Sequence, residues 1–331
     1  MVYKRTVKSV MCMLLVVFVL LADLGNSRME VQGAAKTVFI PGMAVKDGRY
    51  IYYAYEGSGV RMGIMRYDVK KKKIKQIVDY KKDGKETNGF EFFNVDDKYI
   101  YAQWDVSHGS DRIGPYYIYR FSKDGKKKEK LARGRAPVLV GSYIYYFAER
   151  TNKEGDWYSE IVGIYRMKKD GSGQEKINTS QGGFLWKSGN QVLYKQNGNV
   201  FFSLDGRKYT KSELEFDNQL MSPLHGRKVP DIKVSDGNYL YFIKSSDETG
   251  IGLFSPEKLC RKNKKTGKTS VIKSFPGKII SATKCGKYLL VAAPEKNKNT
   301  GEYIGEYNGS IFCISLDGRF HKRLQSWSLG E

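Results

Sequence analysis

A tyrosine-rich phrase returns six times along this chain, roughly every 48 residues. Each copy is a turn followed by an apolar run, and the first copy reads Asp47-Gly48-Arg49-Tyr50-Ile51-Tyr52. The apolar runs of the six copies lie at 50–53, 99–101, 143–146, 191–194, 239–241 and 288–290. A strand-forming repeat of this length is typical of a β-propeller blade. The repeat therefore predicts an all-β fold, a six-bladed β-propeller made of four-stranded antiparallel blades.

Each repeat supports four short strands, A to D, of which the tyrosine phrase is strand B. Strand C carries motifs such as Ile118-Tyr119-Arg120, and strand D often follows an Asp-Gly turn such as Asp124-Gly125, which accepts the positive backbone angles of a tight hairpin. We expect the tyrosines to fill the core between blades. Residues 36–331 are predicted to form one domain, because each blade packs on its neighbours. The blades are expected near 42–80, 90–133, 136–178, 183–213, 231–273 and 279–325.

The N-terminus has the pattern of a secretory signal peptide. Three basic residues within the first eight precede an uncharged apolar run over 10–22, which is short for a membrane span. We therefore assign 1–35 to a signal peptide and expect a secreted or cell-envelope protein, with an uncleaved anchor as the alternative. Three alanines fit as the cleavage position: Ala22, Ala34 and Ala35.

The net charge of the chain indicates an acidic partner. The formal charge is +22, and it falls only to about +20 when residues 1–35 are removed. Expected partners are an anionic cell-wall polymer or an anionic membrane surface. Three cysteines remain, Cys260, Cys285 and Cys313, which form no disulfide framework; we expect buried thiols, with one bridge as the alternative.

The third repeat carries a family resemblance. The run from Tyr143-Ile144-Tyr145-Tyr146 to Ile164-Tyr165-Arg166 and on to Ile177 resembles the YWTD blade of the low-density-lipoprotein-receptor type, whose propellers are also six-bladed. The chain is most similar to exported bacterial propellers of the TolB-like and receptor-like kinds, domains of unknown function. The Trp-Thr-Asp part of the family phrase is absent from every copy, so no ligand residue is carried over. The resemblance implies the fold and a binding role rather than catalysis.

In a four-stranded meander the C–D turns lie at one end, with the A–B turns, and the B–C loops lie at the other. The C–D turns sum to about +17 and the B–C loops to about −6. We expect the lysine-rich turns to dock on an anionic surface; the alternative is that they only keep blade edges solvated. The lysines of this prediction are Lys70, Lys71, Lys72, Lys73, Lys126, Lys127, Lys128, Lys262, Lys264 and Lys265.

The long B–C loops hold aromatic residues outside the repeat phrase, which predicts a glycan or peptide site. In this hypothesis Trp104 and Trp157 stack on the ligand, and Asp105, Asp156 and Glu160 accept hydrogen bonds. The alternative is that the aromatic side chains pack on each other over the channel mouth. The other residues of the predicted site are His108, Tyr158, Phe254, Tyr303 and Tyr307.

Motifs of common enzyme and metal sites are absent from the sequence. The three histidines, His108, His225 and His321, have no metal-binding spacing, and no nucleophile elbow or phosphate loop occurs. We predict no metal and no cofactor, and no nucleic-acid partner, because the lysines are not interleaved with aromatic residues. The sequence thus favours a monomeric, non-catalytic binding module. A secreted carbohydrate-active enzyme that uses two loop carboxylates is the runner-up.

Overall fold

The structure is a computed structural model, and every element it describes is a β-strand. The described residues are 36–38, 42–54, 62–82, 85–87, 89–106, 115–152, 155–180, 185–195, 200–204, 208–210, 214–216, 219–220, 234–245, 256–295 and 308–328. The predicted signal peptide over 1–35 lies outside them. The chain divides into two compact units, 1–36 and 37–331, and nearly all of the described residues belong to the second unit.

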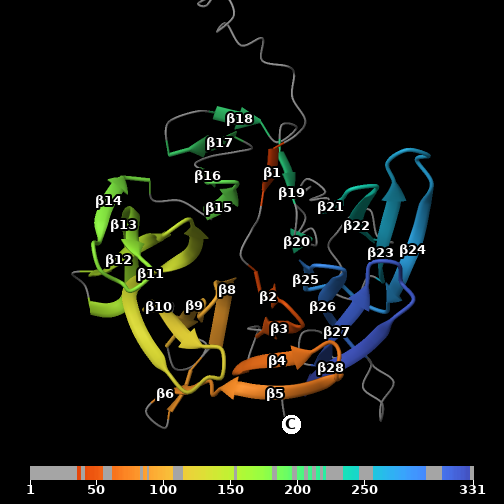
Figure 1. Ribbon diagram of the computed structural model, residues 1–331, viewed down its shortest axis with the longest axis horizontal. Helices are drawn as coiled ribbons and strands as arrows, with labels where there is room; N and C mark the ends of the chain where they lie inside the picture. Colours follow the sequence, from red (N-terminus) through yellow and green to blue (C-terminus); the bar gives the residue numbers. More distant parts are fainter. Residues whose placement is uncertain are drawn as a thin grey trace, which may run out of the picture. The chain divides into compact units, whose positions relative to one another are not determined.

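Groups of four antiparallel strands follow one another along the chain (Figure 1), and we number them meanders 1 to 6; meanders 2 and 3 share the long strand β11 within one seven-stranded sheet. Meander 1 contains β2 (Ala44–Asp47), β3 (Tyr50–Tyr53), β4 (Ile64–Asp68) and β5 (Lys73–Val78). Meander 2 contains β8 (Gly89–Val95), β9 (Tyr99–Asp105), β10 (Tyr116–Ser122) and the first half of β11 (Lys128–Val140). Meander 3 contains the second half of β11, β12 (Tyr143–Asn152), β13 (Gly155–Lys168) and β14 (Glu175–Asn178).

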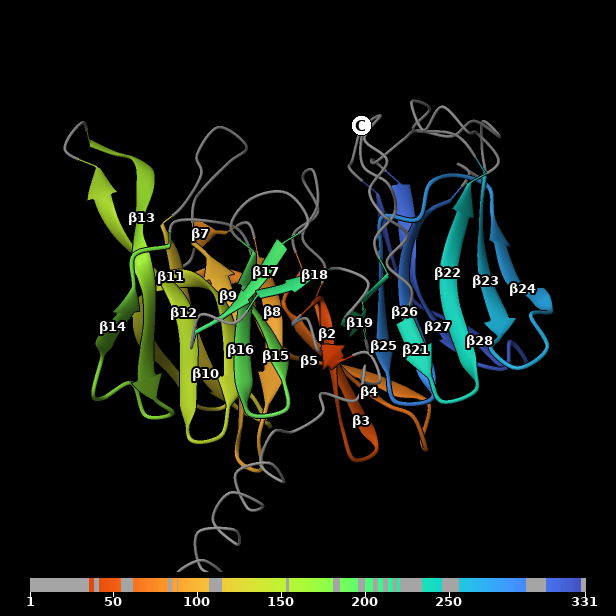
Figure 2. The same cartoon turned by 90° about the horizontal axis from the view of Figure 1, so that it is seen from above.

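The remaining meanders repeat this order, as Figure 2 shows for β21 to β24 of meander 5. Meander 4 contains β15 (Leu185–Ser188), β16 (Gln191–Lys195), β17 (Val200–Ser203) and β18 (Lys208–Thr210). Meander 5 contains β21 (Val234–Asp236), β22 (Tyr239–Ser245), β23 (Glu257–Asn263) and β24 (Thr269–Phe275). Meander 6 contains β25 (Ser281–Cys285), β26 (Tyr288–Pro294), β27 (Asn308–Ser315) and β28 (His321–Ser328). Short strands extend two of the sheets: β1 (Lys36–Val38) and β19 (Leu214–Phe216) join meander 5, and β20 (Gln219–Leu220) joins meander 6. The strands β6 (Lys81–Lys82) and β7 (Lys85–Glu86) form a separate two-stranded sheet.

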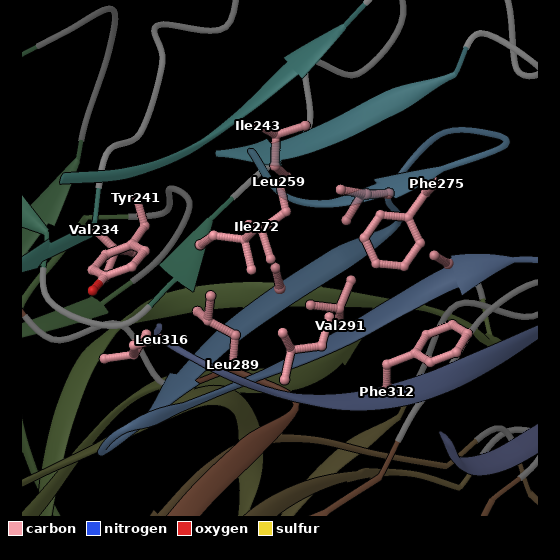
Figure 3. Close-up of a cluster of buried hydrophobic side chains, with 14 residues drawn as sticks. Val234, Tyr241, Ile243, Leu259, Ile272, Phe275, Leu289, Val291, Phe312 and Leu316 are labelled. Atoms are coloured by element: carbon pink, nitrogen blue, oxygen red, sulfur yellow. The ribbon is translucent and has the colours of Figure 1, made fainter. Parts of the chain in front are cut away.

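The core lies between consecutive meanders. Tyr52 of meander 1 packs in one cluster with Phe90 and Phe121 of meander 2, and similar clusters join meanders 2 to 3 and 3 to 4. Figure 3 shows the cluster between meanders 5 and 6, where the rings of Phe275 and Phe312 meet edge to face with their centroids 5.7 Å apart. Sheets of four antiparallel strands that each pack on the next are the architecture of a β-propeller. The prediction of an all-β fold made of four-stranded antiparallel sheets is therefore confirmed.

One further cluster joins the last meander to the first. Tyr53 and Tyr67 of meander 1 pack with Leu290 and Cys313 of meander 6, and all four side chains are buried. Apolar side chains on one face of a sheet are stabilised when another sheet excludes water from them. Meander 6 therefore covers the face of meander 1 that carries Tyr53 and Tyr67.

A tyrosine–arginine pair recurs in four meanders. The arginine on the third strand lies opposite one tyrosine of the second strand and over the ring of the preceding tyrosine, as Arg120 does with Tyr101 and Tyr99. The distances from guanidinium carbon to ring centroid are 4.7 Å for Arg66 and Tyr50, 4.8 Å for Arg120 and Tyr99, 4.7 Å for Arg166 and Tyr143, and 5.1 Å for Arg261 and Tyr239. A guanidinium over an aromatic face is attracted by the ring quadrupole, so the pair braces each sheet at its turn end.

Candidate functional site

The A–B and C–D turns of neighbouring meanders contact one another. Three of the stacked arginines donate to a carbonyl in the C–D turn of the next meander: Arg66 to Lys123 at 3.4 Å, Arg120 to Lys169 at 3.1 Å, and Arg261 to Leu316 at 3.3 Å. Two lysines of these turns reach back to an A–B turn, with Lys123 pairing with Asp47 at 2.6 Å and Lys169 with Asp96 at 3.4 Å. Lys72 of meander 1 lies over the ring of Phe320 in the turn of meander 6, at 5.7 Å. The turns of meanders 5, 6, 1, 2 and 3 therefore form one continuous surface, which we call the turn face.

The Asp-Gly turn of meander 2 shows how closely these turns approach the neighbouring sheet. Gly125 has a φ of 79°, and a Cβ added there would lie 1.8 Å from the carbonyl oxygen of Ile77 in meander 1. Only glycine fits both the backbone angle and the space. The turn is thus fixed against β5, and the lysines that follow Gly125 start from a rigid position.

All ten lysines of the docking prediction are exposed on the turn face. They come from the C–D turns of meanders 1, 2 and 5. Lys126 lies 3.8 Å from Asp124, Lys264 bonds to the hydroxyl of Ser235 at 2.5 Å, and the Lys128 ammonium lies 4.8 Å from the centroid of the Trp104 ring. The turns that carry these lysines are held through their backbone, as when Asp68 accepts hydrogen bonds from the amides of Lys70 and Lys71. Apart from the Lys128 and Lys264 ammonium groups, which contact Trp104 and Ser235, these exposed lysines extend from turns that are held by their backbone.

Trp104 lies in the core rather than in a loop, which corrects the sequence analysis. Its side chain is 0% exposed on β9, with its ring centroid 4.8 Å from Phe90 and 5.0 Å from Tyr119, and its indole N–H donates to the Thr87 hydroxyl at 2.7 Å. The strand continues past the tyrosine phrase to Asp105, so the residues expected in a loop are paired with β10. A fully buried ring has no face open for a ligand, and the predicted stacking on Trp104 does not fit this structure.

The other predicted loop residues differ in how far they are described. Asp105 is 2% exposed at the end of β9, and Glu160 lies on β13 in an ion pair with Arg150 at 2.8 Å. Residues 148–152 and 155–161 are strand residues of the β12–β13 pair, where a loop was expected. The strand Gly155–Lys168 includes Asp156, Trp157 and Tyr158, but the side chains of these three residues lie outside the described part of the structure. His108, Phe254, Tyr303 and Tyr307 lie outside it as whole residues.

The sequence analysis did not find a group of buried carboxylates at the loop end of meanders 2 and 3. Glu149 is 7% exposed and pairs with Arg135, whose guanidinium lies 4.9 Å from the centroid of the Tyr116 ring. Burial of Glu91, and then its repulsion by Asp105, raises the pKa of the Glu91 carboxyl above its ordinary range. The signal in the sequence was single acidic residues next to apolar and aromatic ones, such as Glu91 between Phe90 and Phe92.

An open depression of about 380 Å³ lies on the turn face between meanders 2 and 3. Its lining includes Lys98 and Tyr99 after the A–B turn of meander 2, Ser142 and Tyr143 at the A–B turn of meander 3, and Lys168 at the end of β13. None of these five residues belongs to the sites predicted from the sequence.

Asp96 anchors the floor of this depression. Its carboxylate accepts hydrogen bonds from the amides of Lys98 and Tyr99 and from the Tyr101 hydroxyl, each at 2.9 Å. Burial raises the pKa of Asp96, but these hydrogen bonds and the charge of Lys169 outweigh burial, and the net shift is downward. The A–B turn of meander 2 is therefore held in one geometry by an ionised side chain.

Neither a metal-binding cluster nor a membrane-spanning helix is present among the described residues. In that part of the chain, no three His, Cys, Asp or Glu side chains lie close enough together to hold a metal ion. Over the same residues, no helix has the length and apolarity needed to span a membrane.

Comparison with known proteins finds distant propeller structures and no sequence family. No protein-family model matches the chain, and no curated protein is a significant match. TolB from Acinetobacter baumannii is 13% identical with a TM-score of 0.44, over 86% of this chain and 66% of that one. A 6-phosphogluconolactonase homologue from Bacteroides uniformis, described as a candidate enzyme, is 12% identical with a TM-score of 0.35, over 88% and 85%. An acylaminoacyl peptidase from Pyrococcus horikoshii is 11% identical with a TM-score of 0.38, over 87% and 45%.

These similarities are to β-propeller proteins. This chain spans about two thirds of TolB and less than half of the peptidase. At such identities and TM-scores, none of the three assigns an activity, a ligand or a family to it.

Proposed function

We propose that the protein is an exported, six-bladed propeller that docks through its turn face on an anionic polymer of the cell envelope. The observation that carries this proposal is the position of the ten exposed lysines in turns of meanders 1, 2 and 5, on one continuous surface. Charges of one sign gathered on one face attract a polyanion over about a Debye length, roughly 10 Å at 0.1 M salt. A membrane surface rich in anionic lipid is the other acceptor of the same chemistry.

The loop end contributes to this proposal only as a second contact, to a glycan or peptide. Trp104 and Asp105 are buried, so this contact would depend on the predicted residues whose side chains lie outside the described structure. The carbohydrate-active alternative needs two carboxylates open to substrate. Glu149 is buried and paired with Arg135, and Glu160 is paired with Arg150, so neither favours that alternative.

Binding at two salt concentrations tests the proposal. The purified protein is mixed with an anionic wall-polymer fraction, with vesicles of anionic lipid and with vesicles of neutral lipid, at 50 mM and 500 mM salt. We expect binding to the wall polymer that weakens at least tenfold at the higher salt. Salt-insensitive binding, or no binding to the polymer at 50 mM salt, overturns the proposal. Preference for the anionic vesicles over the polymer would replace the polymer with the membrane as the acceptor.

A pair of charge-reversed variants separates the turn face from net charge. Lys71→Glu/Lys127→Glu removes two turn-face cations, and Lys244→Glu/Lys258→Glu makes the same charge change on the facing strands β22 and β23, where both lysines are exposed. A lysine near an anionic surface contributes about 1 kcal/mol, so the turn-face variant should weaken polymer binding by at least about tenfold. The control should change the dissociation constant less than about twofold. Equal losses in both variants would show that net charge, not this face, attracts the polymer.

A further inference from the structure

The depression between meanders 2 and 3 has two tyrosine rings in its wall. Tyr99 and Tyr143 occupy equivalent positions at the start of β9 and β12, and both rings are partly exposed. Each ring is covered on one face by an arginine of its own sheet, Arg120 over Tyr99 at 4.8 Å and Arg166 over Tyr143 at 4.7 Å. An arginine on one face holds each ring in place from its own sheet, so the exposed part of the ring forms a fixed apolar surface.

Three of the six charged residues that line the depression are in ion pairs. Lys169 pairs with Asp96 at 3.4 Å, and Arg120 pairs with Glu129 at 2.6 Å. Asp170 accepts hydrogen bonds from the hydroxyl and the amide of Ser172 at 2.7 Å and 3.0 Å, which lower the pKa of its carboxyl. These groups are engaged in holding the turns.

Of the basic residues that line the depression, Lys98 and Lys168 are the two that the ion pairs above do not include. Both are exposed and both line the depression, and no ion pair within 4.0 Å is present for either in the described part of the chain, although the charge of Lys168 acts on the nearby Asp170 carboxylate. They come from different meanders, Lys98 from the A–B turn of meander 2 and Lys168 from the end of β13 in meander 3. The exposed hydroxyl-bearing residue Ser142 lies on the same lining. The depression thus offers two ammonium ions, a hydroxyl and two aromatic surfaces.

We propose that this depression binds one acidic sugar unit, a saccharide ring that carries a phosphate or carboxylate group. The ring lies against the exposed part of Tyr99 or Tyr143, and the anionic group lies between Lys98 and Lys168. A typical small-ligand site has a mainly apolar wall and a small number of polar groups that point toward the ligand. The inference deepens the proposed function, on which it rests for its biological setting: the site holds one repeat unit of the anionic polymer that the turn face attracts.

Four small probes test the site directly: glucose 6-phosphate, glucuronate, glucose and inorganic phosphate, each titrated into the full-length protein and followed by calorimetry or NMR line shifts. We expect glucose 6-phosphate or glucuronate to bind with a dissociation constant on the order of 1 mM, and glucose and phosphate at least tenfold more weakly. The tighter of the two acidic sugars identifies the anionic group as phosphate or carboxylate. Equal binding of inorganic phosphate and glucose 6-phosphate overturns the proposal, because the tyrosines then contribute nothing. No binding of either acidic sugar overturns it as well.

The matched variants are Lys98→Ala/Lys168→Ala and Lys126→Ala/Lys127→Ala. All four lysines are exposed on the turn face, but only the first pair lines the depression. We expect the first variant to weaken the acidic sugar about tenfold, as the loss of two exposed ion pairs implies, and the second to leave it unchanged. Equal effects of the two variants overturn the proposal in favour of diffuse attraction. Circular dichroism of both variants confirms that the sheets are intact.

This inference and the proposed function fail in different ways. Salt-sensitive polymer binding without sugar binding would refute the site and leave docking in place. Sugar binding without polymer binding would refute docking and leave the site as a receptor for a soluble acidic sugar.

Discussion

Replacement of Trp104 distinguishes a core residue from a ligand-binding residue. The indole is the largest of the fully buried side chains in the described structure, and it is surrounded by Phe90, Tyr119 and Phe121 at centroid distances of 4.8, 5.0 and 6.3 Å. Trp104→Ala removes a ring that is 0% exposed and leaves a cavity that rigid aromatic neighbours cannot fill. Truncations of this kind cost about 3–5 kcal/mol.

Trp104→Phe divides this cost into its parts. Phenylalanine keeps an aromatic ring in the cluster but loses the hydrogen bond from the indole N–H to the Thr87 hydroxyl. Thr87 still donates to the Tyr80 carbonyl, so only the acceptor side of its hydroxyl loses a partner. The loss of one buried hydrogen bond and of part of the ring volume should cost about 1–2 kcal/mol.

The assay is equilibrium unfolding in urea, followed by circular dichroism. With a slope of about 3 kcal/mol per molar urea, Trp104→Ala should lower the midpoint by about 1–1.7 M and Trp104→Phe by about 0.3–0.7 M. Lys127→Ala is the control, because Lys127 is exposed in the C–D turn of the same meander and no contact between its side chain and the Trp104 ring is present in the described structure. Its midpoint should stay close to that of the wild type. An unchanged midpoint for Trp104→Ala, together with lost ligand binding, would refute the burial argument and restore the sequence-based prediction.

Contacts of single residues give four further predictions. Arg120→Ala removes the stacking on Tyr99, the ion pair with Glu129 and the hydrogen bond to the Lys169 carbonyl. Thermal unfolding should show that the free energy of unfolding falls by about 1–3 kcal/mol. An unchanged stability would contradict the bracing role of the arginine. The pKa of the Asp96 carboxyl is lowered in the folded state, so its contribution to stability is present above the unfolded pKa of about 4 and is lost as the pH falls through the folded value. Asp96→Asn should therefore be less stable than the wild type at pH 7, and the difference in unfolding free energy should shrink below about pH 4. A difference that stays constant with pH would exclude the ionised carboxylate as its cause. Glu257 is 2% exposed and accepts a hydrogen bond from the Ile279 amide at 2.6 Å; Glu257→Ala should cost about 1–3 kcal/mol in urea unfolding, while Glu257→Gln, which keeps an acceptor oxygen, should cost less. Burial raises the pKa of Cys313 to about 12 and shifts Cys260 and Cys285 in the same direction; at pH 8 a thiol reagent should react with these three cysteines only after unfolding, and rapid reaction in the native protein would show that the sheets open.

Much of the fold could be predicted from the repeat, because the sequence of each copy indicates its own strands and turns. Some tyrosines of the phrase are buried as expected, since Tyr52, Tyr101, Tyr146 and Tyr241 are at most 2% exposed, whereas the first tyrosine of a copy, such as Tyr99 or Tyr143, is partly exposed. The Asp-Gly turns have the positive φ that their composition predicts, as at Gly125 and Gly171. Local chemistry of this kind needs no knowledge of which sheets are neighbours.

The error at Trp104 had a visible cause. The strand of meander 2 is longer than the phrase, and Ile100, Ala102 and Trp104 share one core cluster while Tyr101 belongs to another. The period of two therefore continued past the phrase to Asp105, and it marked Trp104 as a strand residue facing the core. Counting aromatic residues outside the repeat as loop residues ignored this alternation.

The depression and the inter-meander ion pairs could not be predicted in the same way. Lys123 and Lys169 look like any other turn lysines in the sequence, yet they pair with Asp47 and Asp96 of the preceding meander. Which lysines remain available then depends on contacts across sheets, and these are set by how the sheets pack. The sequence identified the charged face but not the two cations within it that are open to a ligand.

The cluster between the first and last meanders has a consequence for the order of events during synthesis. Tyr53 and Tyr67 become buried only when Leu290 and Cys313 pack on them. The hydrogen bond from the Lys322 ammonium to the Lys72 carbonyl likewise joins positions 250 residues apart. Until the final sheet has emerged, the apolar face of the first sheet stays in contact with solvent or with other chains. We expect the nascent protein to depend on a holding factor for nearly the whole of its translation, and truncations that lack only the last sheet to aggregate rather than to form a smaller ring.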